Sequence, residues 1–315
     1  MTTDLKKSVI LHAGVVLALF VLQFVLPAYH HGNMARIMVL ASYAIGYNLL
    51  FGYTGLLSLG HALFFAAGLY GAGLAMSQFG LSAGPALVIG VVAGVVIGAV
   101  VGGLALRTEG VAFMIVTLMF AQAGYLTILY FGAYTRGDEG FVIAQTERVL
   151  FGVDLSAPLV RYFAAFSLFC AAILTCFLAV KSRFGRVLVA IRENEERAAM
   201  LGYDVAKYKL GAVVLSAGLS ALAGAGYALL FGYVGASFAS VQYSIFPLLW
   251  VLLGGAGTVL GPLVGTVFMF YLIDLSSGLT TAYMLIAGLV LVVLTVFAPQ
   301  GVMGEVRRRM WRWLP

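Results

Sequence analysis

The sequence predicts an all-α polytopic membrane protein with about ten transmembrane helices. Hydrophobic residues make up 63% of the chain and charged residues 10%, against about 45–50% and about 25% in soluble proteins. The mean hydropathy is +1.06. Glycine contributes 39 of 315 residues, about 12% against a usual 7%, and small residues favour helix contacts in lipid. This composition excludes a soluble enzyme, a disordered regulator and a nucleic-acid-binding domain.

The apolar runs give the number of spans. A transmembrane helix needs about 20 mostly apolar residues. Because Gly254 to Pro262 interrupt the long stretch 241–275, we divide that stretch into two spans. The first run is 18 residues long and ends before Pro27, longer than the 7–15 residues of a signal peptide, so we expect a retained span. Besides the two spans of 241–275, the runs lie at 9–26 (the first), 34–56, 61–79, 85–106, 110–134, 158–180, 208–232 and 282–297.

The basic residues predict the orientation of these spans. Of 18 Lys and Arg residues, thirteen lie in three segments, which the positive-inside rule places in the cytoplasm. Even numbers of spans separate the three segments, so both termini are expected inside and the loop 135–157 outside. We expect one transmembrane domain over 1–315. The basic residues are Lys6 and Lys7, seven residues of the loop 181–209, and Arg307, Arg308, Arg309 and Arg312 of the tail 299–315.

Four glycines recur every fourth residue in the fourth span. Such a stripe lets another backbone approach closely, which is how helices associate in lipid. Both an internal helix contact and the seam of a homodimer fit this pattern. The four residues are Gly90, Gly94, Gly98 and Gly102.

No catalytic constellation is found in the sequence. The stretch 80–84 matches G-x-S-x-G, but it joins two membrane helices and every histidine precedes it. No phosphate-binding loop is present. Cys170 and Cys176 share one apolar run, which indicates neither a disulfide nor a metal site. His61 and Asp274 are too few for a proton relay. We expect a chain that is not an enzyme and binds no metal or cofactor.

Two glycine-rich breaks interrupt apolar helices, at 52–61 and 254–262. Broken helices expose backbone groups that lipid cannot satisfy, so they line cavities or are covered by protein. Transporters hold polar solutes at such breaks, but tight cytoplasmic turns also explain them. The span count places both on the cytoplasmic side, unlike a strict inverted repeat. Candidate translocation-path residues are Gly52, Thr54, Gly55, Ser58, His61, Gly254, Gly255, Gly257 and Thr258.

The loop 181–209 is the most polar stretch of the chain. Asn194 is suited to cap a short helix whose first turn holds Glu195 and Glu196, where acidic residues favour the helix dipole. Gly202 provides a stop signal. The expected surface helix is charged on one side and offers apolar residues to a partner, namely Ala198, Ala199 and Leu201.

This loop carries a resemblance to a known family. Glu196, Arg197 and Ala198 followed by Gly202 are similar to the E-A-A-x-x-x-G coupling motif of ABC importer permeases, with Arg197 in place of the first Ala. The chain resembles most specifically the second permease of the high-affinity branched-chain amino acid importers, in the stretches 52–65, 185–210, 216–229 and 252–266. ATPase coupling is then implied for Arg192, Glu193, Asn194, Glu195, Glu196, Ala198, Ala199, Gly202 and Tyr203.

The resemblance also implies partners in a bacterial inner membrane. They are a homologous permease, two cytoplasmic ATPases that carry ATP and Mg²⁺, and a periplasmic binding protein, which together import a solute by alternating access. Related permeases take branched-chain amino acids, urea, short amides or aromatic carboxylates. Arg136 replaces a glycine of the family pattern, so the outer loop gives no basis for assigning a substrate. The alternative is an ion-driven transporter or a solute channel, which would work without ATP and carry more charge within the membrane.

Overall fold

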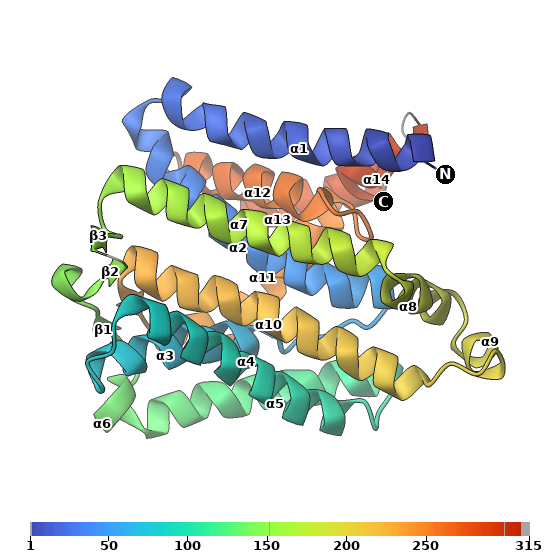
Figure 1. The fold of residues 1–315 in the computed structure, drawn as a ribbon, viewed down its shortest axis with the longest axis horizontal. Coiled ribbons are helices and arrows are strands. Elements are labelled where there is room, and N and C mark those ends of the chain that lie inside the picture. Colours follow the sequence, from blue (N-terminus) through green and yellow to red (C-terminus); the bar gives the residue numbers. More distant parts are fainter. Residues whose placement is uncertain (1, 151, 299, 310–315) are drawn as a thin grey trace.

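The long helices run side by side along one axis of the molecule (Figure 1). This computed structural model describes residues 2–150, 152–298 and 300–309; Arg312 of the basic tail lies outside them. The helices of the first half are α1 (Thr2–Val25), α2 (Ala28–Asn48), the π-helical turn η1 (Leu49–Tyr53), α3 (His61–Ser77), α4 (Ala83–Ala105), α5 (Gly110–Tyr130) and α6 (Gly132–Thr135).

The second half contains the remaining long helices and the segments that connect them. Its helices are α7 (Pro158–Lys181), α8 (Arg183–Glu193), α9 (Glu195–Met200), α10 (Val205–Phe231), α11 (Val241–Gly254), α12 (Gly261–Ser277), α13 (Tyr283–Phe297) and α14 (Gly301–Arg309). Short elements complete the chain: β1 (Phe141–Val142), η2 (Gln145–Glu147), β2 (Val149–Leu150), β3 (Val153–Asp154), β4 (Tyr233–Val234) and η3 (Ala236–Ala239). β1 pairs antiparallel with β4, and β2 with β3.

The described helices confirm the all-α polytopic prediction. Among the described residues, six helices are long and apolar enough to cross a membrane and four shorter apolar helices accompany them. These ten correspond to the ten predicted runs. The stretch 241–275 divides at Gly254 as expected, because α11 ends there and α12 begins at Gly261.

The helices α2 and α10 form the centre of the bundle. In the most apolar 18-residue stretch of each span, 83% of the residues are buried in α2 with η1 and 72% in α10. The corresponding share is only 17% in α1 and in α5. α10 packs against α2, α3 and α4. The outer helices therefore present apolar side chains to lipid, while α2 and α10 carry the polar residues described below.

The glycine stripe of α4 forms an internal helix contact. A Cβ on Gly94 would lie 2.1 Å from the Ala221 Cβ of α10, and one on Gly98 would lie 2.4 Å from the Ala217 Cβ. Gly102 faces Val213 of α10 in the same way, and Gly90 lies against both Ala225 of α10 and Gly68 of α3. Because the stripe is filled by α10 of the same chain, it does not offer the seam of a homodimer.

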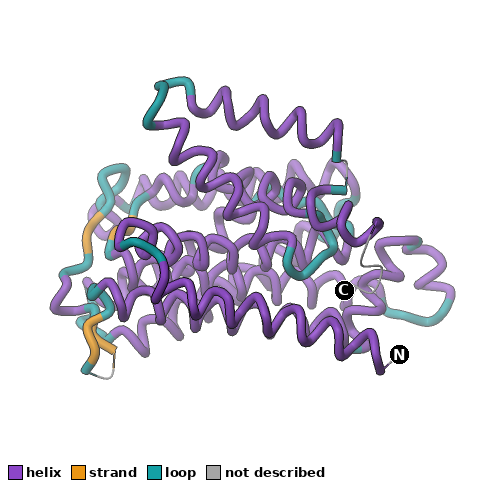
Figure 2. The backbone as a smooth tube through the Cα atoms, turned by 90° about the horizontal axis from the view of Figure 1, so that it is seen from above, coloured by secondary structure: helices purple, strands orange, loops and turns teal. Residues whose placement is uncertain are grey.

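The two ends of the bundle differ in character (Figures 1 and 2). One end carries the described N-terminal residues, α8, α9 and α14, and is called the basic end; the positive-inside rule assigns it to the cytoplasm. The opposite end, called the outer end, carries the short strands. There Arg136 has a φ of +61°, the left-handed conformation that glycine adopts without strain, at the position where the family pattern has glycine.

Candidate functional site: the junction of the two helix breaks

The two glycine-rich breaks meet at the basic end, joined by Asn48. α2 ends at this residue and continues as the π-turn η1. The fully buried Asn48 side chain donates from Nδ2 to the Thr258 carbonyl and accepts at Oδ1 from the Gly257 N–H, both at 2.9 Å. A single amide therefore satisfies backbone groups that the second break has freed from helical bonding.

Two positions in this junction require glycine, one because the backbones approach closely and the other because of its backbone conformation. A Cβ on Gly52 would lie 2.1 Å from Asn48 Oδ1 and 2.4 Å from the Gly257 nitrogen. Gly257 has a φ of +72°, which side-chain-bearing residues rarely adopt. The first and second breaks, more than 200 residues apart in sequence, thus form one structural unit, which we call the break junction (Gly52–Gly55, Asn48 and Gly255–Thr258).

Two arginines bind this junction from the outside. Arg192, at the end of α8, donates from Nη1 to the Gly52 carbonyl. Arg307, in α14, donates to the Gly257 carbonyl at 3.2 Å. The side chain of Arg192 also lies against Gly55. The predicted coupling loop, both breaks and the C-terminal helix therefore converge on a few carbonyl groups.

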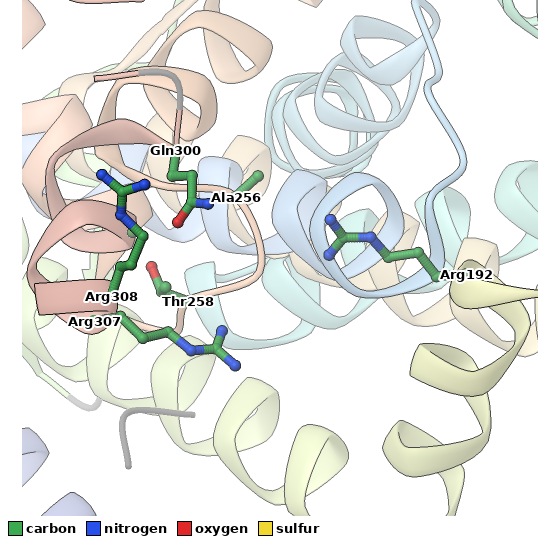
Figure 3. A pocket seen from close by; sticks show the side chains of 7 residues that line it. Arg192, Ala256, Thr258, Gln300, Arg307 and Arg308 are labelled. Atoms are coloured by element: carbon green, nitrogen blue, oxygen red, sulfur yellow. The ribbon is translucent and has the colours of Figure 1, made fainter. Parts of the chain in front are cut away.

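Two cavities open beside these arginines. One cavity of about 570 Å³ is lined by Arg192, Thr258, Gln300, Arg307 and Arg308, among others. Figure 3 shows that Arg192 approaches it from one side and that Arg307 and Arg308 lie on the opposite side. A second of about 540 Å³ is lined by Tyr53, Arg186, Glu193 and again by Arg192 and Arg307. The break junction is thus accessible from the basic end and surrounded by positive charge.

The hydroxyl groups predicted for the translocation path bond to the local backbone. Thr54 Oγ1 donates to the Leu49 carbonyl at 3.1 Å, and Thr258 Oγ1 donates to the Gly255 carbonyl at 2.8 Å. Ser58 Oγ accepts from the Gly60 N–H. In this conformation these side chains stabilise the breaks, and Thr258 also lines a cavity. Their contact with a solute stays a prediction.

His61 lies apart from the break junction, in the buried centre of the bundle. Its Nε2 is 2.8 Å from Ser216 Oγ, which itself donates to the Gly46 carbonyl at 2.6 Å. His61 therefore joins α3 to α10 and α2. The structure does not bring this residue together with Gly52 or Gly257.

The coupling loop folds as two helices rather than one. The short helix expected after Asn194 is α9, whereas α8, which precedes it, was not predicted; the extended backbone of Asn194 separates the two helices. As predicted, its side chain caps α9 by accepting from the Arg197 N–H at 2.7 Å. Gly202, with a φ of +87°, follows the end of α9.

The apolar edge of α9 differs from the prediction in one residue. Ala198 is only 2% exposed because it packs against Val187 and Ile191 of α8. It is therefore not available to a partner. Ala199 is exposed as predicted, and so are the larger apolar residues Met200 (83%), Leu201 (71%) and Tyr203 (41%). Glu195 forms an ion pair with Lys209, which anchors α9 to the start of α10.

Sequence reasoning missed two residues of the junction, Asn48 and Arg307. Asn48 is an amide inside an apolar run, directly before the first break, and a polar residue at that place is a signal for a buried bonding role. Arg307 belongs to the basic tail, which served only to predict orientation. Its bond to the second break required the fold.

The fold defines a polytopic α-helical membrane protein whose helix breaks are joined to a segment projecting from one end. The chain belongs to the family described as the permease component of branched-chain amino acid transport systems, whose sequence profile matches residues 32–298. It is accordingly a multi-pass permease of the bacterial inner membrane.

Curated relatives agree with this assignment. The chain is 27% identical over 297 residues to the high-affinity branched-chain amino acid transport system permease protein LivM of Salmonella typhimurium, and 26% identical over 297 residues to LivM of Escherichia coli. Both alignments cover 87% of this chain and 69% of the relative. A probable LivM of Methanocaldococcus jannaschii is 37% identical over 83 residues, 26% of this chain and 24% of the relative. No solved structure matches the chain significantly.

Proposed function

We propose that this chain is one of two permease subunits of an ABC importer for branched-chain amino acids. A homologous permease completes the membrane domain, a periplasmic binding protein delivers the solute, and two cytoplasmic ATPases hold the ATP and Mg²⁺. The family and the relatives support the transport of branched-chain amino acids. The contacts of Arg192 and Asn48 support the coupling of an external ATPase to the helix breaks.

The Arg192 contact carries the coupling part of this proposal. α8 and α9 project from the basic end (Figure 1), and α9 exposes Met200, Leu201 and Tyr203. An ATPase docked on this edge moves α8, and the bond from Arg192 to the Gly52 carbonyl conveys that motion to η1. Asn48 conveys it further to the second break. Both breaks then change together, as alternating access requires.

Separating docking from coupling tests the proposal. In complexes reconstituted with both ATPases and the binding protein, Leu201→Glu is expected to abolish co-purification of the ATPases, because it places a charge on the docking edge. Leu279→Glu is the matched control, since Leu279 is also exposed (87%) but lies at the outer end.

The coupling variant is Arg192→Gln, and its control is Arg183→Gln, because Arg183 is an exposed arginine at the start of α8 and lies outside the coupling motif. Arg192→Gln is expected to keep the ATPases bound while leucine uptake per ATP hydrolysed falls at least about tenfold, within the usual range of coupling free energies. Unchanged uptake per ATP in Arg192→Gln would contradict the coupling role. ATP-independent uptake by the wild-type complex would instead support a channel or a secondary transporter.

A further inference from the structure

A third cavity, of about 340 Å³, lies toward the outer end between α2, α10, α11, α12 and α13. Its volume is within the range of small-molecule sites. Six aromatic side chains line it: Tyr227, Phe238, Tyr243, Phe246, Trp250 and Phe270. Arg36 and Asp274, which carry opposite charges, line it as well. We call this the aromatic cavity.

Arg36 belongs to a group of arginines that have no carboxylate partner. The Arg36 and Arg161 guanidinium groups lie 5.3 Å and 5.8 Å from the centre of the same Phe231 ring. Arg148 is only 6% exposed, and its Nη1 donates to the Leu230 carbonyl beside that ring. The buried Nε atoms of Arg148 and Arg161 have no hydrogen-bond partner. Within residues 2–150, 152–298 and 300–309, none of the three forms an ion pair.

This arrangement favours an anionic ligand on one side of the cavity. Cations held close together repel one another, burial of the Arg148 charge without a counter-charge is costly, and guanidinium groups pair best with planar, bidentate carboxylates. The positive-inside rule disfavours such a group at the outer end, so orientation in the membrane does not account for it. Arg36 is the exposed member of this group, so a carboxylate entering the cavity can reach its guanidinium and offset the positive charge of the cluster.

Asp274 supplies the opposite charge on another helix. It lies near the end of α12, and its Oδ2 accepts a hydrogen bond from Tyr29 at 3.0 Å. Among the described residues it has no cationic partner. The carboxylate is therefore held in place by a neutral donor and keeps the capacity to bind a cation.

We infer that the aromatic cavity binds an α-amino acid as a zwitterion. Arg36 faces the α-carboxylate, Asp274 faces the α-ammonium group, and the aromatic wall receives an apolar side chain. This assignment rests on the proposed function and adds to it a recognition site within the permease, separate from the binding protein. The lining of the cavity includes no residue of the break junction, and in this inference it is an outer site that a solute occupies before it reaches the breaks.

Ligand analogues test the assignment, because each removes one charge. Purified permease complex without the binding protein is titrated with L-leucine, with leucinamide, which lacks the carboxylate, and with 4-methylpentanoate, which lacks the ammonium group. The wild type is expected to bind leucine at least tenfold more tightly than either analogue. The ratio of two affinities within one preparation does not depend on how much of a variant is folded.

Each variant is expected to lose one preference and keep the other. Arg36→Gln should bind leucine and leucinamide equally while still rejecting 4-methylpentanoate. Asp274→Asn should show the reverse, and Arg36→Lys and Asp274→Glu should restore both preferences. Arg136→Gln, a cation of the outer loop that does not line the cavity, is the control.

Other outcomes overturn the inference in distinguishable ways. If both variants keep both ratios, the cavity is not the recognition site, whereas importer function stands if the wild-type complex still takes up leucine with ATP. If the wild-type complex takes up neither leucine, isoleucine nor valine, the proposed function fails and the inference fails with it. Equal affinity of the wild type for all three ligands would indicate a merely apolar cavity, filled by lipid or by a helix of the partner permease.

Discussion

The two ends of the bundle use arginine in opposite ways. At the basic end, Arg192 and Arg307 donate to carbonyls of the helix breaks, so their charge stabilises backbone that has left its helical bonding. At the outer end, Arg36 and Arg161 lie over one aromatic ring without a carboxylate. The arginines of the break junction are thus bonded within the chain, as the proposed coupling requires, while Arg36 and Arg161 form no such bonds with the described residues, as the proposed ligand site requires.

The largest effect on stability is expected at the break junction. Asn48→Ala removes a donor and an acceptor from two buried backbone groups, each costing about 1–3 kcal/mol when left unsatisfied. A clear fall in the unfolding temperature of the detergent-solubilised protein is the expected result. Ser42→Ala is the control, because Ser42 is equally buried in α2 but bonds only to the Met38 carbonyl of its own helix.

Two further outcomes sharpen this prediction. Asn48→Asp keeps the acceptor for the Gly257 N–H but loses the donor to Thr258, so it should destabilise the protein also. An equal loss of stability in Ser42→Ala and Asn48→Ala would show that the junction has no special role, and that the two breaks are independent turns.

Neutralising one arginine at each end is expected to change the free energy of unfolding differently, with a moderate loss at the basic end only. Arg307→Gln loses the bond to the Gly257 carbonyl and should cost about 0.5–1.5 kcal/mol of folding free energy. Arg161→Gln removes one of three neighbouring cations, so the free energy of unfolding should stay unchanged or increase. Equilibrium unfolding of both variants in detergent measures the difference. If Arg161→Gln destabilises as much as Arg307→Gln, the outer arginines are structural, and the contrast between the ends fails.

Much of the fold follows from the sequence, because apolar length and basic segments act locally. The division of 241–275 and the cap at Asn194 were both predictable in this way. α8 was also within reach, since Val187, Leu188 and Ile191 are spaced for one buried helix face. The buried position of Ala198 could not be predicted, because it depends on how α9 packs against α8 rather than on the local sequence pattern.

The break junction shows where sequence reasoning ends. The breaks themselves are visible as glycine clusters, but their meeting depends on the tertiary approach of η1 to the loop after α11. Asn48 and Gly257 are 209 residues apart, and no local pattern links them. The same holds for Arg36 and Asp274, each of which looks like an isolated charge near the end of a span until the fold places both in one cavity.

The smallest expected effect is on the pH dependence of stability, through one aspartate at each end. The side-chain bond to Lys207 is the main cause that lowers the pKa of Asp204, which caps α10, while bonds to Ser156 lower the pKa of Asp154 in the outer loop. Because both values are lowered, each turn stabilises the fold above the usual aspartate pKa of about 3.9 and loses this contribution as pH falls through the lowered value.

High salt is expected to distinguish the ion pair that lowers the pKa of Asp204 from the serine hydrogen bonds that lower the pKa of Asp154. The Asp204–Lys207 ion pair is exposed (2.8 Å; side chains 50% and 84% exposed), and exposed ion pairs of this kind are weakened by high salt. In carboxyl-labelled protein followed by NMR, high salt is expected to raise the pKa of Asp204 toward its usual value and to leave that of Asp154 low. Lys207→Gln should reproduce the first change without salt, and Ser156→Ala should raise the pKa of Asp154 alone. Equal salt dependence at both aspartates would mean that charge, rather than the serine, governs the outer turn, and that the outer arginines also act on it.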